Sequence, residues 1–206
     1  MTHLDGAAPF FAVALLLSPL TARWLRGAAG LALTAAVAAV LSFLPLCGGI
    51  GLAGLILSVV PLFSVPTALL LAAGLARYWL SSEWLTRSDL VPLFIVNAVF
   101  GTVLYVSALG QTSWQIYDLG YRFSVLFVLW AAATVLLAVL GSRSAVLLLA
   151  AAAAWLAGLL PSPNLSDYVI DLPLYLYSLG MLASLHREAS GSLLRETPVR
   201  PGLRLE

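Results

Sequence analysis

IYDLGYR, residues 116–122, lies at the start of a long apolar segment and contains the one arginine that departs from the charge pattern of the chain. The preceding apolar segment runs from Leu90 to Leu109, and this one runs from Asp118 or Leu119 to Leu140. Each is close to the ~20 apolar residues that a helix needs to cross a bilayer. Because most of the chain repeats this alternation of apolar segment and short polar connection, the sequence predicts an all-α fold, a polytopic helical membrane bundle.

The composition excludes several classes of protein. The 206 residues are 62% hydrophobic and 9% charged, whereas soluble domains carry about 25% charged residues. The net charge of +1 provides no basic field, so we expect no nucleic-acid partner. The absence of lysine excludes Schiff-base chemistry, and the single cysteine, Cys47, excludes an intramolecular disulfide.

About seven spanning helices are expected, with six or eight also compatible with the pattern. The uncertainty lies in segment 50–80, which is too long for one straight span and is interrupted by Pro61 and Pro66. It forms either one long kinked span, or a short re-entrant piece at 50–60 followed by a span from 66 to 80. The expected segments are 7–22, 27–46, 50–80, 90–109, 118–140, 145–160 and 171–185.

The arginines predict the orientation. With seven spans, nine of the ten fall on one side of the membrane, and the positive-inside rule makes that side cytoplasmic. The N-terminus is then outside and the C-terminus inside, in the inner (plasma) membrane of a bacterium. Residues 1–187 form one transmembrane domain, and 188–206 form a cytoplasmic tail that is mobile or lies on the membrane surface. The nine are Arg23, Arg26, Arg77, Arg87, Arg143, Arg187, Arg195, Arg200 and Arg204.

Arg122 is the exception, because this topology places it outside with acidic residues. Asp118 lies four positions before it, so the two can form an ion pair on one face of a helix. The structural interpretation is that Asp118 caps the fifth span and Arg122 pairs with it. The functional interpretation is a recognition or gating pair at an outer vestibule.

A second polar cluster at residues 164–173 precedes the seventh span. Asn164 and Asp167 have the spacing of a helix cap, and Asp171 followed by Pro173 is typical of an N-cap with proline in the first turn. Alternatively, Asp167 and Asp171 repel each other unless a cation bridges them, and Arg122 is the candidate bridge if spans five and seven pack together.

Aromatic and amide residues complete the candidate set. Outer tyrosines form either an interfacial belt or a pocket for a lipid headgroup or glycan. Asn97, Gly101 and Tyr105 share one face of the fourth span, which indicates helix packing more than ligand binding. The candidate binding residues are Asp118, Arg122, Asp167, Asp171, Tyr117, Tyr121 and Tyr168 on the outer side, with Asn97 and Tyr105 at mid-span.

The preferred function is an accessory or scaffold subunit of a cell-envelope or membrane assembly, with lipids and another membrane protein or a second copy as partners. The spans contain no histidine, the chain has no lysine, and acid-x₂-acid runs are absent, so no catalytic residue, metal or cofactor is expected. One alternative is a small secondary transporter or channel with an outward vestibule near Asp118 and Arg122. A second alternative is a lipid- or glycan-handling membrane enzyme.

These three classes differ in the structure that each requires. A transporter predicts a water-accessible cavity that reaches Asn97. An enzyme predicts that Asp118, Asp167, Asp171 and Arg122 converge around an open cleft. An accessory subunit predicts a dry bundle, together with an exposed apolar groove or a partner that co-purifies with it.

Overall fold

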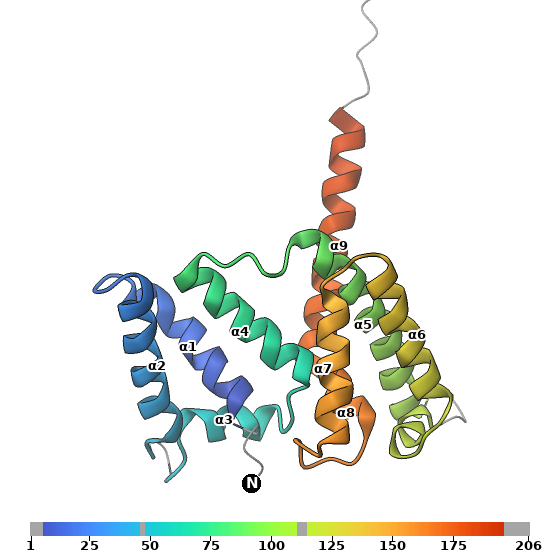
Figure 1. Cartoon of the computed structure of the whole chain (residues 1–206), viewed down its shortest axis with the longest axis horizontal. Helices are drawn as coiled ribbons and strands as arrows, with labels where there is room; N and C mark the ends of the chain where they lie inside the picture. The colour runs from blue at the N-terminus through green and yellow to red at the C-terminus, as the bar shows by residue number, and fades with distance from the viewer. Residues whose placement is uncertain (1–5, 46–47, 111–114, 196–206) are drawn as a thin grey trace, which may run out of the picture.

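The computed structural model describes residues 6–45, 48–110 and 115–195. Within these ranges the backbone forms nine α-helices and one 3₁₀ helix and no β-strand, which confirms the all-α prediction. Seven of the α-helices have 13 or more residues and run across the body of the molecule (Figure 1). The elements are α1 (Ala7–Thr21), α2 (Gly27–Phe43), α3 (Leu52–Val59), α4 (Val65–Leu80), α5 (Arg87–Ala108), η1 (Ile116–Tyr121), α6 (Val125–Val139), α7 (Ser144–Leu156), α8 (Leu165–Val169) and α9 (Leu172–Arg195).

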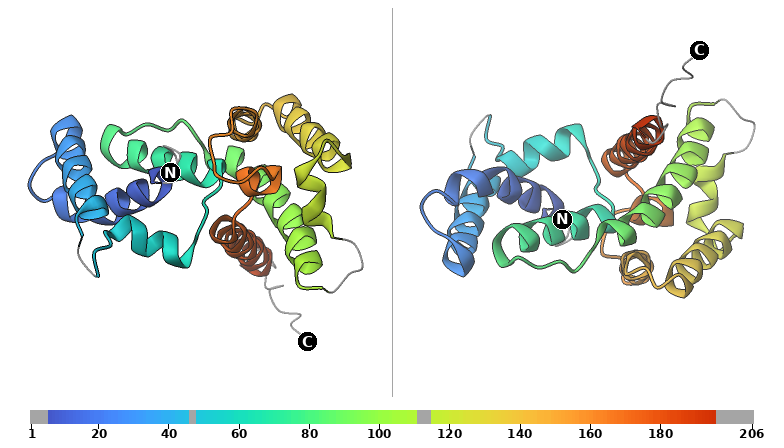
Figure 2. Two further views of the ribbon diagram at one scale, coloured as in Figure 1. Left: turned by 90° about the horizontal axis from the view of Figure 1, so that it is seen from below. Right: turned by 90° about the horizontal axis from the view of Figure 1, so that it is seen from above.

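The helices form two groups, which lie side by side in both views of Figure 2. The N-terminal group contains α1 to α4, and its core is built around Val13, Ala14 and Trp79. The C-terminal group contains α5 to α9 with η1, and its core includes the fully buried Leu93 and Leu147. The two groups meet where α4 packs against α7 and α8.

The long segment 50–80 folds as two helices. The short α3 packs on α1 and α2, and α4 is a separate helix that starts after Pro61. Ser64 caps α4 by accepting a hydrogen bond from the Thr67 amide, and Pro66 occupies the first turn, where its missing N–H costs nothing. The division into a short piece followed by a separate helix is therefore confirmed.

The start of α6 differs from the sequence prediction. We expected a helix from Asp118 or Leu119, but residues 116–121 form η1, and α6 begins only at Val125. Ser124 is the actual cap, because its hydroxyl accepts from the Leu126 amide at 3.2 Å. Asp118 and Ser124 are both residue types that cap helices, so residue type alone did not mark this boundary.

The helix α9 is longer than predicted. It continues to Arg195, ten residues beyond the expected end at residue 185. Figure 1 shows that its C-terminal part projects away from the bundle. The first residues of the expected tail at 188–206 are therefore helical, and residues 196–206 lie outside the described part of the chain.

A polar contact that the sequence did not predict joins the connection α4–α5 to the connection α6–α7, at the end of the bundle from which α9 projects. Thr86 and Asp89 form a reciprocal capping box at the start of α5. The Asp89 carboxylate also accepts from the Arg143 amide at 2.9 Å, and the Asp89 carbonyl accepts from the Ser144 hydroxyl at 2.5 Å. The connection between α4 and α5 is thus fixed to the turn between α6 and α7.

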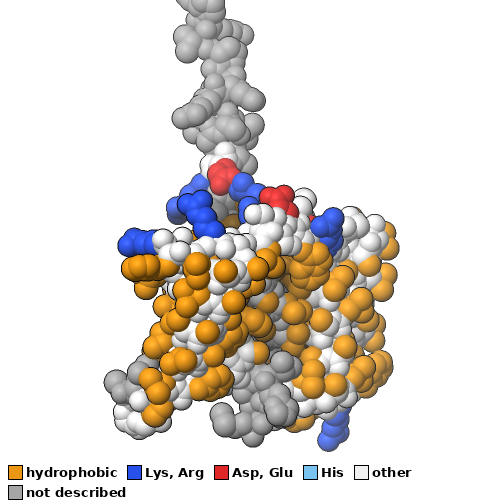
Figure 3. Space-filling model, turned by 60° about the vertical axis from the view of Figure 1, so that its left-hand side comes forward, with side chains coloured by type: hydrophobic (Ala, Val, Ile, Leu, Met, Phe, Trp, Pro, Cys, Tyr) orange, Lys and Arg blue, Asp and Glu red, His pale blue; other side chains and the backbone are white. Residues whose placement is uncertain are grey.

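The flanks of the molecule are apolar. Phe123, Val59 and Leu16 are 83%, 82% and 79% exposed. Figure 3 shows hydrophobic side chains over most of the visible face, with basic side chains gathered at the end from which α9 projects and one at the opposite end. Among the described helices, α5 is long and apolar enough by length and composition to cross a membrane, and five others are apolar but have 13 to 17 residues.

Replacement of Gly30 tests the packing of the N-terminal group. A Cβ atom at Gly30 would overlap the ring of Trp79 and crowd the Leu25 carbonyl. We expect Gly30→Ala to destabilise the protein by about 1–3 kcal/mol, the usual cost of overpacking, measured as thermal unfolding in mild detergent.

Gly180→Ala is the matched control, because nothing lies within 4 Å of a Cβ atom at that helical glycine. It should leave the unfolding temperature unchanged or raise it slightly through better helix propensity. Equal effects of the two substitutions would contradict the contact between α2 and α4.

Candidate functional site

Asp171 joins the first residues of two helices from different groups. Its Oδ1 accepts from the Leu174 amide at 2.7 Å, which makes it the N-cap of α9 as predicted. Its Oδ2 accepts from the amide of Ser64, the N-cap residue of α4, also at 2.7 Å. The residue is buried, and a carboxylate is stabilised at helix N-termini by the helix dipoles. Asp171 therefore fastens α4 to α9.

Asp167 has a similar internal role. Its two oxygens accept from the Tyr117 hydroxyl at 3.1 and 2.9 Å, and it also accepts from the Ser162 hydroxyl. Burial raises the pKa of the Tyr117 phenol above its ordinary value, and the hydrogen bonds with Asp167 and Tyr121 raise it further. Tyr117 therefore remains a protonated donor at neutral pH and holds η1 to the start of α8.

Asn164 completes this contact between η1 and α8. Its Oδ1 accepts from the Ser166 amide at 2.8 Å, which confirms the predicted cap of a short helix. Its Nδ2 donates to the Tyr117 carbonyl at 2.9 Å. Gly120 lies so close to the Asn164 side chain that a Cβ atom would clash with it, so this approach requires glycine.

Tyr168 belongs to the core and not to an outer pocket. It is fully buried, its hydroxyl donates to the Leu160 carbonyl, and it accepts from the Leu160 amide, both at 2.9 Å. These two bonds satisfy the backbone of the chain shortly after α7 ends. Tyr121, by contrast, is exposed and meets Tyr117 edge to face at a centroid distance of 5.7 Å.

The predicted ion pairs of Arg122 are not formed. In the described ranges the one salt bridge joins Arg87 to Glu188 at 2.6 Å. Asp118 and Arg122 are both exposed, and Arg122 has an extended backbone after a 3₁₀ helix, so the i, i+4 spacing of an α-helix does not apply. Asp167 and Asp171 need no bridging cation, because neutral N–H and O–H donors satisfy each of them separately.

The face of α5 that carries Asn97, Gly101 and Tyr105 was predicted to pack against another helix, and that helix is α9. The Tyr175 ring covers Gly101, and it lies against the Tyr105 ring at a centroid distance of 5.1 Å with the two ring planes tilted by 43°. Asn97 is fully buried and donates to the Leu93 carbonyl at 3.1 Å. Its Oδ1 has no partner among the described groups, and Asn97 is not among the residues that line either of the two grooves described next.

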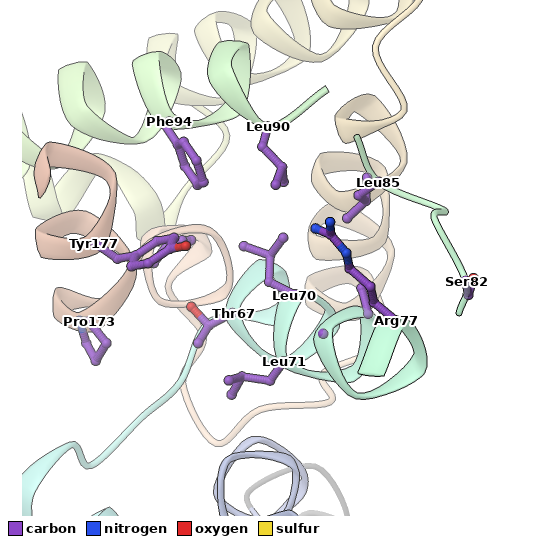
Figure 4. A pocket seen from close by; sticks show the side chains of 13 residues that line it. Thr67, Leu70, Leu71, Arg77, Ser82, Leu85, Leu90, Phe94, Pro173 and Tyr177 are labelled. Carbon is purple, nitrogen blue, oxygen red and sulfur yellow. The ribbon is translucent and has the colours of Figure 1, made fainter. Parts of the chain in front are cut away.

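A groove of about 490 Å³ lies between α4, α5 and α9, and we call it the α4–α9 groove. Figure 4 shows Arg77 at one end and Pro173 and Tyr177 toward the other. Arg77 is the only charged residue that lines it. The lining residues are Thr67, Leu70, Leu71, Ala73, Gly74, Arg77, Ser82, Leu85, Leu90, Phe94, Pro173, Leu174 and Tyr177.

A second groove of about 420 Å³ lies between α5, η1, α6 and α8, and it carries no charged side chain. It is lined mainly by leucine, valine and isoleucine, together with Phe100 and Trp130. Neither location was predicted, because each groove is created by the relative placement of helices. The one sequence signal was Arg77, which lies inside an apolar helix and not in a connection.

Comparison of the chain with protein-family models, with curated proteins and with solved structures finds no match. Within the part of the chain that the structure describes, no three His, Cys, Asp or Glu side chains come together as a metal site. The function is therefore argued from the geometry of the buried acids and of the two grooves.

Asp171→Asn tests the contact between α4 and α9. An amide offers one acceptor oxygen where the carboxylate offers two, so one buried backbone N–H loses its partner. We expect a destabilisation of about 1–3 kcal/mol, measured by thermal unfolding in detergent.

Asp118→Asn provides the control at an exposed acid near the same end of the molecule. Its effect should stay within about 0.5 kcal/mol, as for most surface substitutions. If Asp118→Asn were as destabilising as Asp171→Asn, the assignment of these roles would be wrong.

Proposed function

We propose that the chain is an integral membrane protein of about seven spans that acts as an accessory or scaffold subunit of a cell-envelope or membrane assembly. One observation carries the proposal. The acids Asp167 and Asp171 are engaged in helix-joining hydrogen bonds, whereas the flanks are largely apolar and the lining of the two grooves is apolar apart from Arg77 and a few hydroxyl groups. Such a molecule offers apolar surface for packing in a bilayer, and its acids Asp167 and Asp171 serve the fold.

The placement of the helix ends supports the proposed orientation. The connections α1–α2, α4–α5 and α6–α7 and the projecting part of α9 lie at one end of the molecule (Figure 1). Basic side chains gather at this end in Figure 3, so the positive-inside rule assigns it to the cytoplasm. The N-terminus is then outside, in the inner membrane of a bacterium.

The shorter helices can still serve as spans. At 1.5 Å per residue, helices of 13 to 17 residues extend about 20–25 Å, against a hydrocarbon core of about 30 Å. Apolar flanking residues and local thinning of the bilayer make up such differences at modest cost. Exposed side chains such as Leu16 and Val139, each more than three-quarters exposed, are then in contact with lipid.

The geometry favours this function over the two alternatives. A transporter or channel needs water at mid-span, yet Asn97 is fully buried and lines neither groove. An enzyme of the kind considered needs its acids and Arg122 around one cleft. Asp118 and Arg122 are exposed, whereas Asp167 and Asp171 are occupied by internal donors.

Reporter fusions test the membrane topology. We expect alkaline phosphatase to be active when fused after residues 115 or 163, and inactive when fused after residues 86 or 143. A fluorescent protein that folds only in the cytoplasm should give the opposite pattern at the same four sites. An unchanging pattern along the chain, or release of the protein from membranes by alkaline carbonate, would contradict the proposal.

Deletion of the gene tests the accessory role. A scaffold subunit should co-purify in mild detergent with another membrane protein or with a second copy, and its loss should lower the amount of the assembled partner complex. Reintroduction of the chain with Asp118→Ala should restore that amount, because Asp118 is exposed and joins no helices. Solute flux through liposomes that contain this chain alone would instead favour the transporter.

A further inference from the structure

The α4–α9 groove combines one available positive charge with a long apolar surface. Arg77 lies three residues before the end of α4 and is exposed. Among the described residues its side chain makes no salt bridge and no hydrogen bond. In contrast, Arg87 pairs with Glu188, and Arg143 donates to the Trp84 carbonyl. The Arg77 guanidinium is therefore free to bind an anion.

The remaining lining is suited to a hydrocarbon chain. Leu70, Leu71 and Phe94 form apolar walls along the groove, and hydroxyl groups occur only at Thr67, Ser82 and Tyr177. Thr67 and Arg77 are ten residues apart on α4, which corresponds to about 15 Å along the helix. The groove therefore runs from a cation near one end of α4 to an apolar region near its other end.

We propose that the α4–α9 groove binds an anionic phospholipid of the cytoplasmic leaflet, with its phosphate on Arg77 and an acyl chain along α4 toward Thr67. This inference rests on the proposed membrane orientation, which places Arg77 at the cytoplasmic headgroup level. Basic pockets between transmembrane helices on that side bind acidic headgroups. A guanidinium is well suited to phosphate, because its planar fork donates two parallel hydrogen bonds.

The position of the charge distinguishes a lipid from a partner helix. A typical apolar helix seated in the groove would cover Arg77 without offering an acceptor, and a buried unpaired charge is costly. A phospholipid suits both parts of the groove, because its phosphate pairs with Arg77 and its acyl chain covers the apolar walls. The second groove has no charged lining residue, so it offers no such selection for an anion.

Mass spectrometry of co-purified lipids tests the proposal on the full chain in mild detergent. Arg77→Gln should reduce phosphatidylglycerol and cardiolipin per protein about fivefold, the change expected for the loss of one arginine near anionic lipid. Leu71→Trp, which fills the groove but keeps the charge, should also reduce them. Arg23→Gln is the control, because Arg23 is an exposed arginine at the same end that does not line the groove.

A titration of the unsubstituted protein keeps the test independent of variant folding. Phosphatidylglycerol should raise the unfolding temperature more than phosphatidylcholine or inorganic phosphate at equal concentration. Equal protection by phosphatidylcholine would contradict the claim that the groove selects an anionic headgroup. Equal protection by inorganic phosphate would contradict the claim that the ligand is a lipid. Equal lipid loss in Arg23→Gln and Arg77→Gln, or a protein helix cross-linked in the groove, would also overturn the proposal. If the reporter topology holds while these tests fail, only this inference fails.

Discussion

The carboxylate of Asp171 fixes the start of α4 to the start of α9, and it adds a buried polar contact to the packing of α4 on α7 and α8 that joins the two helical groups. It accepts from the amides of Ser64 and Leu174, and so it caps α9 and binds the start of α4 with one buried group. A buried backbone N–H without a partner costs about 1–3 kcal/mol, so this contact is strongly specified. From this point α4 and α9 diverge toward the end that carries Arg77 (Figure 1), and the α4–α9 groove lies between them.

Other polar residues at the Asp171 end of the molecule also join elements of the fold. Tyr117, Asp167 and Asn164 connect η1 to α8, and Tyr168 satisfies the backbone after α7. The acid and amide of this cluster, Asp167 and Asn164, are structural hydrogen-bond partners, whereas Asp118 is exposed. The flanks between the two ends are largely apolar, which is the property expected of the proposed packing against lipids and other membrane proteins.

The sequence predicted those features that depend on local chemistry. Apolar segment length predicted the positions of most helices, Pro61 and Pro66 predicted the break in segment 50–80, and the caps at Asn164 and Asp171 followed from residue type and spacing. The features that it missed depend on tertiary contacts. The 3₁₀ helix at residues 116–121 arises where Gly120 meets Asn164, a residue more than forty positions away. Because residues 116–121 form a 3₁₀ helix, Asp118 and Arg122 do not share one face of an α-helix. The two grooves depend on how whole helices pack against one another, which local sequence patterns do not show.

The most direct test of this account is the distance distribution between spin labels on α4 and α9 in lipid nanodiscs. Leu80→Cys and Leu179→Cys place the labels at exposed positions in a Cys47→Ser background. We predict one narrow distribution for this protein, a broadened distribution after the further substitution Asp171→Asn, and no change after Asp118→Asn. An unchanged distribution in Asp171→Asn would contradict the claim that the Asp171 carboxylate fixes α4 relative to α9.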